Sequence, residues 1–285
     1  FSRYVTSFTS GEISVEAAVM VRLAEVPPTA GTGEMVIPEG LFEFTPALKG
    51  VVTADAAGLV TFRPAEPLQP ATRYTVAFHL GRLLDVEKPF RVLRFSFRTL
   101  AQHFTIGEGG LFTDAALDYR GMSYSAAVIT ADVADQDLVE KVVKVRFNGR
   151  VVPVRWSHSP DKLSHTFTAD SLMRNETTPG KLLISWDGKP LKVKMKGEKS
   201  VEVPPMNQFT VIGVSVQTSP EQQVRVLFSD PLVPDQAVEG LAGLGNEVQY
   251  TWQIDGNRLI LWPLEKMTGE VALTLFKGIE SVDGK

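Results

Sequence analysis

The chain has 285 residues and a formal net charge of −4, and hydrophobic residues make up 44% of it against 22% charged residues. This composition is typical of folded globular protein and excludes a disordered chain and a general nucleic-acid-binding role. No apolar run approaches the roughly 20 residues that cross a bilayer, and the lack of cysteine excludes disulfides, thiol nucleophiles and cysteine metal sites.

Alternation of apolar and polar residues predicts β-strands almost throughout. The sequence has no long apolar stripe of period 3.6, so no long helix is predicted. In the first hundred residues, strands are expected within 13–26, 58–68, 72–81 and 90–100. The loop 29–34 (TAGTGE) and the segment 230–245 are expected to be irregular. The sequence therefore predicts an all-β protein.

Three hairpins are predicted from two-residue turns that tolerate a positive φ: Asn148-Gly149, Asp187-Gly188 and Asp255-Gly256. In each hairpin one register aligns apolar residues across both strands. The expected pairs are Val145 with Val152, Val143 with Val154, Ile184 with Leu191, Leu182 with Val193, Trp252 with Leu259, and Tyr250 with Leu261.

Polar and proline-rich links predict the domain boundaries. A polar link (AQHF) follows the strand at 90–100, and Pro204-Pro205 precede a new strand at 209–216. We predict three tandem antiparallel β-sandwich domains, Ig-like or macroglobulin-like, over 1–100, 101–206 and 207–285. Since the chain starts without an initiator Met and ends on a turn, we expect both ends to be cut from a longer protein.

The first and third of these domains share an order of strand, acidic corner, spacer, strand, proline corner and strand. The corner at 226–243 (VLFSDPLVPDQAVEGLAG) is the clearest example. We predict one module type that occurs twice, on either side of a different sandwich. At each corner the chain is expected to switch from one sheet to the other, because Pro and Asp end a strand ladder.

These corner residues resemble a known family. The run FEFTPALKGVV…GLVTFRPAEPLQPATRYTV resembles the Ig-like module near the amino terminus of bacterial alpha-2-macroglobulins, and the third domain is similar to the segment that follows it in Bacteroidetes-type members. The matching residues are Phe44, Pro46, Gly50, Phe62, Pro64, Pro67, Leu68, Pro70, Thr72 and Tyr74, and then Val226, Phe228, Ser229, Asp230, Pro231, Leu232, Gln236, Gly278, Ile279, Ser281 and Gly284.

The resemblance implies a protease-trapping protein of the bacterial envelope, periplasmic or on the outer surface, and usually tethered as a lipoprotein. Proteases cleave its bait region, and many members carry a Cys–Gln thioester; no bait region is recognisable here, and without cysteine no thioester fits. The expected function is thus a non-catalytic structural part of an endopeptidase inhibitor, with no cofactor. Its partners would be the remaining domains of the full-length protein and, through them, host or competitor proteases. No nucleic acid is expected, and membrane contact only through an anchor outside these residues.

The alternative is a cell-surface adhesin or glycan-binding module made of Ig-like repeats. An exposed tryptophan-rich patch, or a calcium site at a joint between domains, would favour it. Of the four tryptophans, Trp186 and Trp252 are expected in the core, and Trp156 carries no separate prediction. Trp262 falls on the opposite strand face from its apolar neighbours and is the one expected at a contact or binding surface.

Candidate metal or acid–base residues are few. The histidines are His79, expected within a strand, His103, and the pair His158 and His165, which flank a loop without a third ligand at a useful spacing. No nucleophile elbow of the G-x-S-x-G type occurs. We therefore predict no catalytic, cofactor-binding or metal-binding residue.

Two further segments contain residues typical of ligand sites. Asp132, Asp135, Asp137 and Glu140 cluster without the spacing of an EF-hand, so a short helix or loop with a solvated acidic face is expected. The glycines of 106–114 (IGEGGLFTD) lack the context of a phosphate loop and predict a turn between strands.

Residues 141–199 are strongly basic, with 13 Lys and Arg against 5 Asp and Glu. Lys192, Lys194 and Lys196 alternate with apolar residues, which predicts a strand with a lysine ladder on one face. Such lysines commonly guard a sheet edge against pairing. The alternative is a docking patch for anionic lipid, polysaccharide or an acidic partner.

Overall fold

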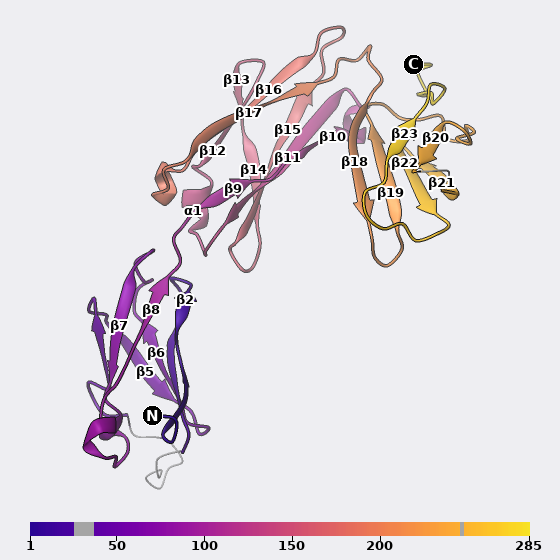
Figure 1. Cartoon of the computed structure of the whole chain (residues 1–285). Helices are drawn as coiled ribbons and strands as arrows, with labels where there is room; N and C mark the ends of the chain where they lie inside the picture. The colour runs from indigo at the N-terminus through magenta and orange to yellow at the C-terminus, as the bar shows by residue number, and fades with distance from the viewer. Residues whose placement is uncertain (26–36, 246–247) are drawn as a thin grey trace. The chain divides into compact units, whose positions relative to one another are not determined.

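The computed structural model describes residues 1–25, 37–245 and 248–285 (Figure 1). The loop 29–34 lies outside these described residues. Strands form nearly all of the regular structure, arranged in sheets that are stacked as tandem β-sandwiches, which confirms the predicted fold class. Within the described residues, the helices are single short turns: η1 (Leu80–Arg82), η2 (Lys88–Phe90), η3 (Ala115–Leu117), α1 (Gln136–Val139) and η4 (Lys189–Leu191).

The chain divides into two compact units. Unit 1 comprises Phe1–Phe104, Thr130–Asp135 and Pro160–Leu163, and unit 2 comprises Thr105–Ile129, Gln136–Ser159 and Ser164–Lys285. The sheets of the second and third predicted domains thus share unit 2, and the division of the chain at 100 and 206 stays a prediction.

The first sandwich has two four-stranded sheets. One has the order β1 (Val5–Phe8), β3 (Val19–Leu23), β6 (Leu59–Pro64), β5 (Gly50–Ala54), and the other β2 (Gly11–Ile13), β8 (Leu93–Thr99), β7 (Arg73–Phe78), β4 (Phe42–Thr45). Pairing is antiparallel except that β2 runs parallel to β8. Alternate residues of both sheets, such as Val21, Val60 and Val76, are fully buried in one shared core, as expected for strands with one face inward.

In the second sandwich the chain alternates between two sheets, with three strands in the first group and two in each later group. Its first sheet has β9 (Phe104–Ile106), β10 (Gly110–Asp114), β11 (Gly121–Thr130), β15 (Ser164–Met173) and β14 (Val154–His158). Its second sheet has the order β13 (Arg150–Val152), β12 (Val143–Phe147), β16 (Gly180–Asp187), β17 (Lys196–Val203). Tyr124, Phe104 and Phe167 are the largest fully buried side chains of the first sheet, and Leu182 and Ile184 of the second.

The third sandwich repeats part of the first. Its larger sheet has the order β18 (Val211–Gln217), β19 (Gln223–Phe228), β22 (Arg258–Pro263), β21 (Tyr250–Asp255), opposite a smaller sheet of β20 (Ala242–Leu244) and β23 (Leu273–Leu275). Val226, Leu244 and Leu259 join both sheets in one core.

The predicted repeat is visible in this topology. Read in chain order, β1-β3-β6-β5 and β18-β19-β22-β21 are the same arrangement, and the pair β4–β7 of the first sandwich corresponds to β20–β23. Pro64 and Pro263 end the equivalent strands β6 and β22, after which the chain enters the other sheet. The corners therefore switch sheets as predicted, since proline has no N–H to donate to the ladder.

The hairpin at Asn148-Gly149 is partly confirmed. Asn148 and Gly149 have φ values of 49° and 82°, which a two-residue turn of the I′ type requires, and Val145 pairs with Val152. Val143 does not pair with Val154 but with Trp186, so that part of the prediction is wrong. Pro153 interrupts the strand, and β14 joins the opposite sheet.

The hairpin predicted at Asp187-Gly188 does not form, and neither does the lysine-bearing strand after it. β16 pairs instead with β17, so that Ile184 faces Lys199 and Leu182 faces Val201, rather than Leu191 and Val193. Pro190 cannot donate to a ladder, and the Asp187 side chain accepts a hydrogen bond from the Lys189 N–H at 3.0 Å. A 3₁₀ turn and a loop therefore occupy residues 189–195.

The third hairpin forms with a register two residues away from the predicted one. Trp252 pairs with Leu261, not Leu259, and Tyr250 pairs with Pro263, not Leu261. The turn residues are Gly256, with φ 59°, and Asn257, which fits a turn that needs positive φ at its first position. The shift of two leaves each side chain on the predicted face.

Candidate functional site

The acidic corner after β19 contains a buried carboxylate. β19 ends at Phe228, Ser229 and Asp230 follow, and Pro231 cannot continue the ladder. The Asp230 side chain is only 2% exposed. A charge this deeply buried needs a cation and hydrogen bonds around it.

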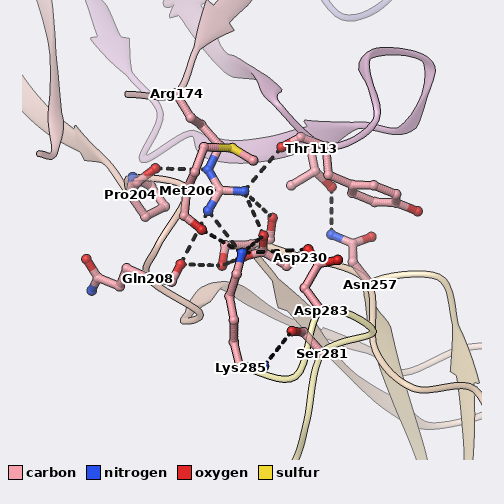
Figure 2. A network of polar contacts seen from close by, with 12 residues as sticks. Thr113, Arg174, Pro204, Met206, Gln208, Asp230, Asn257, Ser281, Asp283 and Lys285 are labelled. Atoms are coloured by element: carbon pink, nitrogen blue, oxygen red, sulfur yellow. Dashed lines mark hydrogen bonds and ion pairs between the residues drawn. The ribbon is translucent and has the colours of Figure 1, made fainter. Parts of the chain in front are cut away.

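Arg174 supplies the cation from the second sandwich. It directly follows β15, where its backbone N–H donates to the Arg120 carbonyl at 2.9 Å. Its guanidinium, 0% exposed, donates to Asp230 through both terminal nitrogens, Nη1 to Oδ1 at 3.0 Å and Nη2 to Oδ2 at 3.2 Å (Figure 2). This is the bidentate geometry that fits a planar guanidinium to a carboxylate.

The remaining donors of Arg174 are directed at backbone carbonyls of the surrounding links. Nε donates to Pro204 at 3.0 Å, and Nη2 to Pro205 at 2.8 Å and Gln208 at 3.3 Å, while Nη1 donates to Ser229 at 3.1 Å and Tyr119 at 3.2 Å. One side chain thus fixes the proline link, the acidic corner and the turn that contains Tyr119. Arginine is suited to this because it carries five donors in a rigid plane.

Asp230 has two further partners. The Ser229 hydroxyl donates to its Oδ2 at 2.6 Å, and Lys285 Nζ donates to Oδ1 at 3.0 Å and to the Met206 carbonyl at 2.5 Å (Figure 2). Burial alone raises the pKa of Asp230, but the hydrogen bonds from Arg174, Ser229 and Lys285 outweigh it and hold that pKa below its ordinary value. The carboxylate is therefore ionised at neutral pH.

A second polar contact lies beside the first. The Asn257 side-chain amide donates to the Thr113 hydroxyl of β10 at 2.7 Å and to the Phe228 carbonyl at 2.6 Å (Figure 2). Together with the Arg174 network, it connects the second and third sandwiches within unit 2. We name the residues Arg174, Ser229, Asp230, Asn257 and Lys285 the ionic joint. Its charges are paired and hydrogen-bonded, so the role that it can serve is to position the second and third sandwiches.

The structure brings two of the four histidines together. His158 and His165 are cross-strand partners in β14 and β15, with their Nδ1 atoms 2.8 Å apart, and His158 Nε2 lies 3.1 Å from Glu140 Oε1. The two nitrogens of His158 thus face different partners. His79 lies just after β7 rather than within a strand, 3.4 Å from Glu43, and His103 is exposed before β9.

The acidic cluster and the glycine segment have structural roles. Asp132 is buried and accepts hydrogen bonds from the N–H groups of Val15 and Val133, both at 2.8 Å, so the predicted solvated position is wrong for this residue. The short helix α1 follows as expected, and Asp135, Asp137 and Glu140 are exposed. Residues 107–109 do not form the predicted turn: β9 and β10 both pair with β11, so these residues interrupt one edge strand, and the Gly107 N–H still donates to the Ala127 carbonyl at 2.8 Å. Among the described residues, no group of three or more His, Asp or Glu side chains is placed to hold a metal ion.

The tryptophans lie at different depths. Trp252 packs on the core of the third sandwich and donates to Glu239 at 3.2 Å. Trp262 is half-buried and lines a hollow with Pro220 and Met267. Trp156 stacks on His158. Trp186, expected in the core, is only half-buried and lines a surface hollow.

Sequence reasoning identified one half of the ionic joint and missed the other. Asp230 stood out because an acidic residue interrupts an apolar strand before proline. Arg174 gives no such signal, because nothing in its neighbourhood distinguishes it from the other Lys and Arg residues. A rule that a buried Asp needs a cation predicts that a partner exists, but only the fold brings residue 174 to residue 230.

Comparisons with known proteins show similarity only at a low level. No protein-family model matches the sequence, and no curated protein matches it. Among solved structures, the chain is similar to titin Ig tandem domains A164-A165, at 8% identity and a TM-score of 0.26, over 72% of this chain and 96% of that one. It is similar to surface layer protein SbsC, domains 1-6, at 10% identity and a TM-score of 0.24, over 96% of this chain and 52% of that one. At these scores the fold class rests on the sheets themselves.

The described part of the chain contains no helix that is both long enough and apolar enough to cross a membrane.

Proposed function

We propose that the chain is a non-catalytic structural arm whose second and third sandwiches are held in one fixed orientation by the ionic joint. The observation that carries this proposal is the buried, bidentate Arg174–Asp230 pair. The two side chains are 0% and 2% exposed, and every nitrogen of the guanidinium has an acceptor. A buried pair of this kind fixes geometry, because any alternative arrangement would leave a charge buried without its partner.

The location of the network supports an orienting role over a purely local one. Arg174 belongs to the second sandwich, Asp230 to the third, and Pro204, Pro205 and Gln208 to the link between them. A flexible link between domains ordinarily leaves relative motion as the default. Here the carbonyls of the link are bound to the same guanidinium as the carboxylate, which opposes such motion.

The whole protein in which this arm serves is, in our proposal, an endopeptidase inhibitor of the alpha-2-macroglobulin type in the bacterial envelope. Its support is the resemblance of the corner residues, which have defined structural roles here. Phe44 and Phe62 contact each other in the first core with ring centroids 4.4 Å apart, and the Tyr74 hydroxyl accepts from the Gln69 N–H at 3.1 Å. Asp230, Leu232 and Ser281 form the corner of the third sandwich.

The lack of cysteine allows a direct test of the rigid arm. Spin labels on Arg150→Cys and Thr251→Cys, both exposed positions in unit 2, report the distance between the second and third sandwiches by pulsed electron resonance. We expect one narrow distance distribution in the parent chain. Adding Arg174→Met and Asp230→Leu should broaden it.

A matched control uses the exposed pair on the same sandwich, Arg155 and Asp170, whose side chains are 74% and 38% exposed. Arg155→Met with Asp170→Leu removes the same two residue types and should leave the distance distribution narrow. A parent distribution as broad as that of the joint variant would refute the rigid arm.

The inhibitor role is tested on the full-length protein. After incubation with an active endopeptidase, a trapping inhibitor is cleaved and then co-elutes with the protease in gel filtration. Cleavage to small pieces without co-elution would refute the inhibitor role and leave the rigid arm, tested separately by the spin labels, unaffected.

A further inference from the structure

The second sandwich has a lysine-rich hollow that the structural role does not use. It has a volume of about 580 Å³ and is formed where α1 and η4 meet the end of β16. Lys141, Lys144 and Lys189 lie around Leu138, Trp186 and Pro190 in its lining. A second hollow of the same volume shares Asp187 and Lys189 with it and adds Lys192, Lys194 and Lys196. We name the two together the basic hollow.

Most of the positive charge of the basic hollow is uncompensated. Six lysines line it against one acidic residue, Asp187. Asp187 is paired with Lys196 at 2.9 Å, and hydrogen bonds from Lys196 and from the Lys189 backbone hold its pKa below the ordinary value. Within the described ranges, the salt bridges include none of the other five lysines, and all six are exposed. The hollow therefore presents a concentrated positive field.

Trp186 adds an aromatic surface. It faces Gly197 across β16 and β17, and its indole lies so close that a Cβ at Gly197 would meet the ring at 2.5 Å. Glycine on the neighbouring strand is what allows the ring to lie down on the sheet. The indole is thereby held in place, half-buried, in the wall of the hollow. Few conformations remain for it to lose on binding a ligand.

The lysines are not needed to protect a sheet edge. Lys192 and Lys194 lie in the loop before β17, outside the strand that forms this edge. β17 has its own exposed charges at Glu198, Lys199 and Glu202, which suffice to discourage pairing with another chain. The edge-guard role predicted for Lys192 and Lys194 is therefore wrong, and their clustering has another cause.

We propose that the basic hollow binds an anionic polysaccharide. The lysines match the carboxylate, sulfate or phosphate groups of such a polymer, and the indole offers a flat apolar surface for the C–H face of a sugar ring. A concave site with its aromatic residue in the wall suits a chain segment laid into it better than a flat membrane surface. A single aromatic residue also lacks the stacking series that single-stranded nucleic acid uses.

The binding test uses the whole chain and polygalacturonate oligomers as the probe, with titration calorimetry at two salt concentrations. We expect saturable binding that weakens with salt, and none to neutral maltooligosaccharides of equal length. Phosphatidylglycerol vesicles and poly-L-glutamate serve as competing polyanions. Tighter binding to either of them than to polygalacturonate would overturn the polysaccharide assignment in favour of a membrane or an acidic protein.

Variants locate the site. Lys189→Gln with Lys194→Gln should weaken polygalacturonate binding by roughly tenfold or more, whereas Lys49→Gln with Lys277→Gln, exposed lysines on other sandwiches, should leave it unchanged. Trp186→Leu should weaken binding of the sugar polymer but not of poly-L-glutamate. If the tryptophan variant does not fold, the lysine variants still decide: equal binding by both lysine pairs would overturn the site.

Discussion

Arg174 and Asp230 lie 56 residues apart in the sequence and form a two-point ion pair, with Nη1–Oδ1 at 3.0 Å and Nη2–Oδ2 at 3.2 Å. Arg174 directly follows β15 of the second sandwich, and Asp230 lies two residues after the end of β19 in the third. The pair places both charges out of water, and the carbonyls around the guanidinium compensate for its lost hydration. The joint is therefore sensitive to the loss of either partner.

Replacement of Arg174 by Met is expected to destabilise unit 2 by about 3–5 kcal/mol, because it leaves a buried carboxylate with only Lys285 as its cation. Urea unfolding followed by tryptophan fluorescence measures this. Arg174→Met with Asp230→Leu removes both charges and should recover part of the loss. A single variant as stable as the parent would show that the pair contributes no stability.

The ionised state of Asp230 predicts a defined dependence on pH. Its pKa is lower in the folded protein than the value of about 3.9 that an unfolded Asp has. The stabilisation is therefore fully present above about pH 4. It is lost as the pH falls through the lower, folded-state pKa, because the unfolded chain binds the proton more readily.

This pH dependence is measured as the free energy of unfolding between neutral pH and the acid limit of the parent, compared with Asp230→Asn. The Asn variant should be less stable at neutral pH, and the difference between the two proteins should shrink on acidification. Asp170 and Asp187 also have lowered pKa values, and comparing the two proteins cancels their contribution. A difference that stays constant with pH would contradict the ionised Asp230.

The sequence predicted the strand content, the repeat and the sheet-switching corners, because these depend on local alternation and on proline. It failed where a local signal competed with a tertiary one. Asp187-Gly188 has the composition of a hairpin turn, yet Pro190 and the Asp187 side chain favour a 3₁₀ turn. Lys192 and Lys194 then lie in the loop before β17 instead of in a strand, and they line a hollow instead of guarding a sheet edge.

The ionic joint could not be predicted from the sequence, because the pairing of its two charged residues depends on the tertiary fold. The corner at Asp230 was visible, but its partner is a residue with no local pattern. The third hairpin shows the limit of turn chemistry: both Asp255-Gly256 and Gly256-Asn257 are plausible turn pairs, and the buried Asn257 amide, bonded to Phe228 and Thr113, favours the second. Contacts between the second and third sandwiches thus determine the register of this hairpin, which the alternation of apolar residues alone does not fix.

In the first sandwich, Thr99 should prove a sensitive position. It is fully buried at the end of β8, where its hydroxyl donates to the Gln69 carbonyl at 2.5 Å and accepts from the Thr72 N–H at 2.9 Å. Thr99→Val keeps the shape of the side chain but removes the partner of the Gln69 carbonyl and of the Thr72 N–H, which costs about 1–3 kcal/mol. Thermal unfolding should show this loss in Thr99→Val and little change in Thr99→Ser, which retains the hydroxyl; equal stability of both would dismiss the hydrogen bonds as the cause.

A substitution at Gly197 tests the basic hollow independently of the ionic joint. A methyl group there would meet the Trp186 ring at 2.5 Å, so Gly197→Ala must displace the indole at a cost of about 1–3 kcal/mol. Since Gly197 has no positive φ in the structure, backbone strain does not contribute. The displaced ring should change the fluorescence of the folded protein and weaken polygalacturonate binding, while leaving the narrow spin-label distance across the ionic joint intact.

The matched control is Gly213→Ala, where the atom nearest to the added methyl group is 3.9 Å away. Gly149→Ala is unsuitable as a control, because Gly149 has φ 82°. If Gly197→Ala kept the parent fluorescence and affinity, the indole would not lie where the hollow requires it.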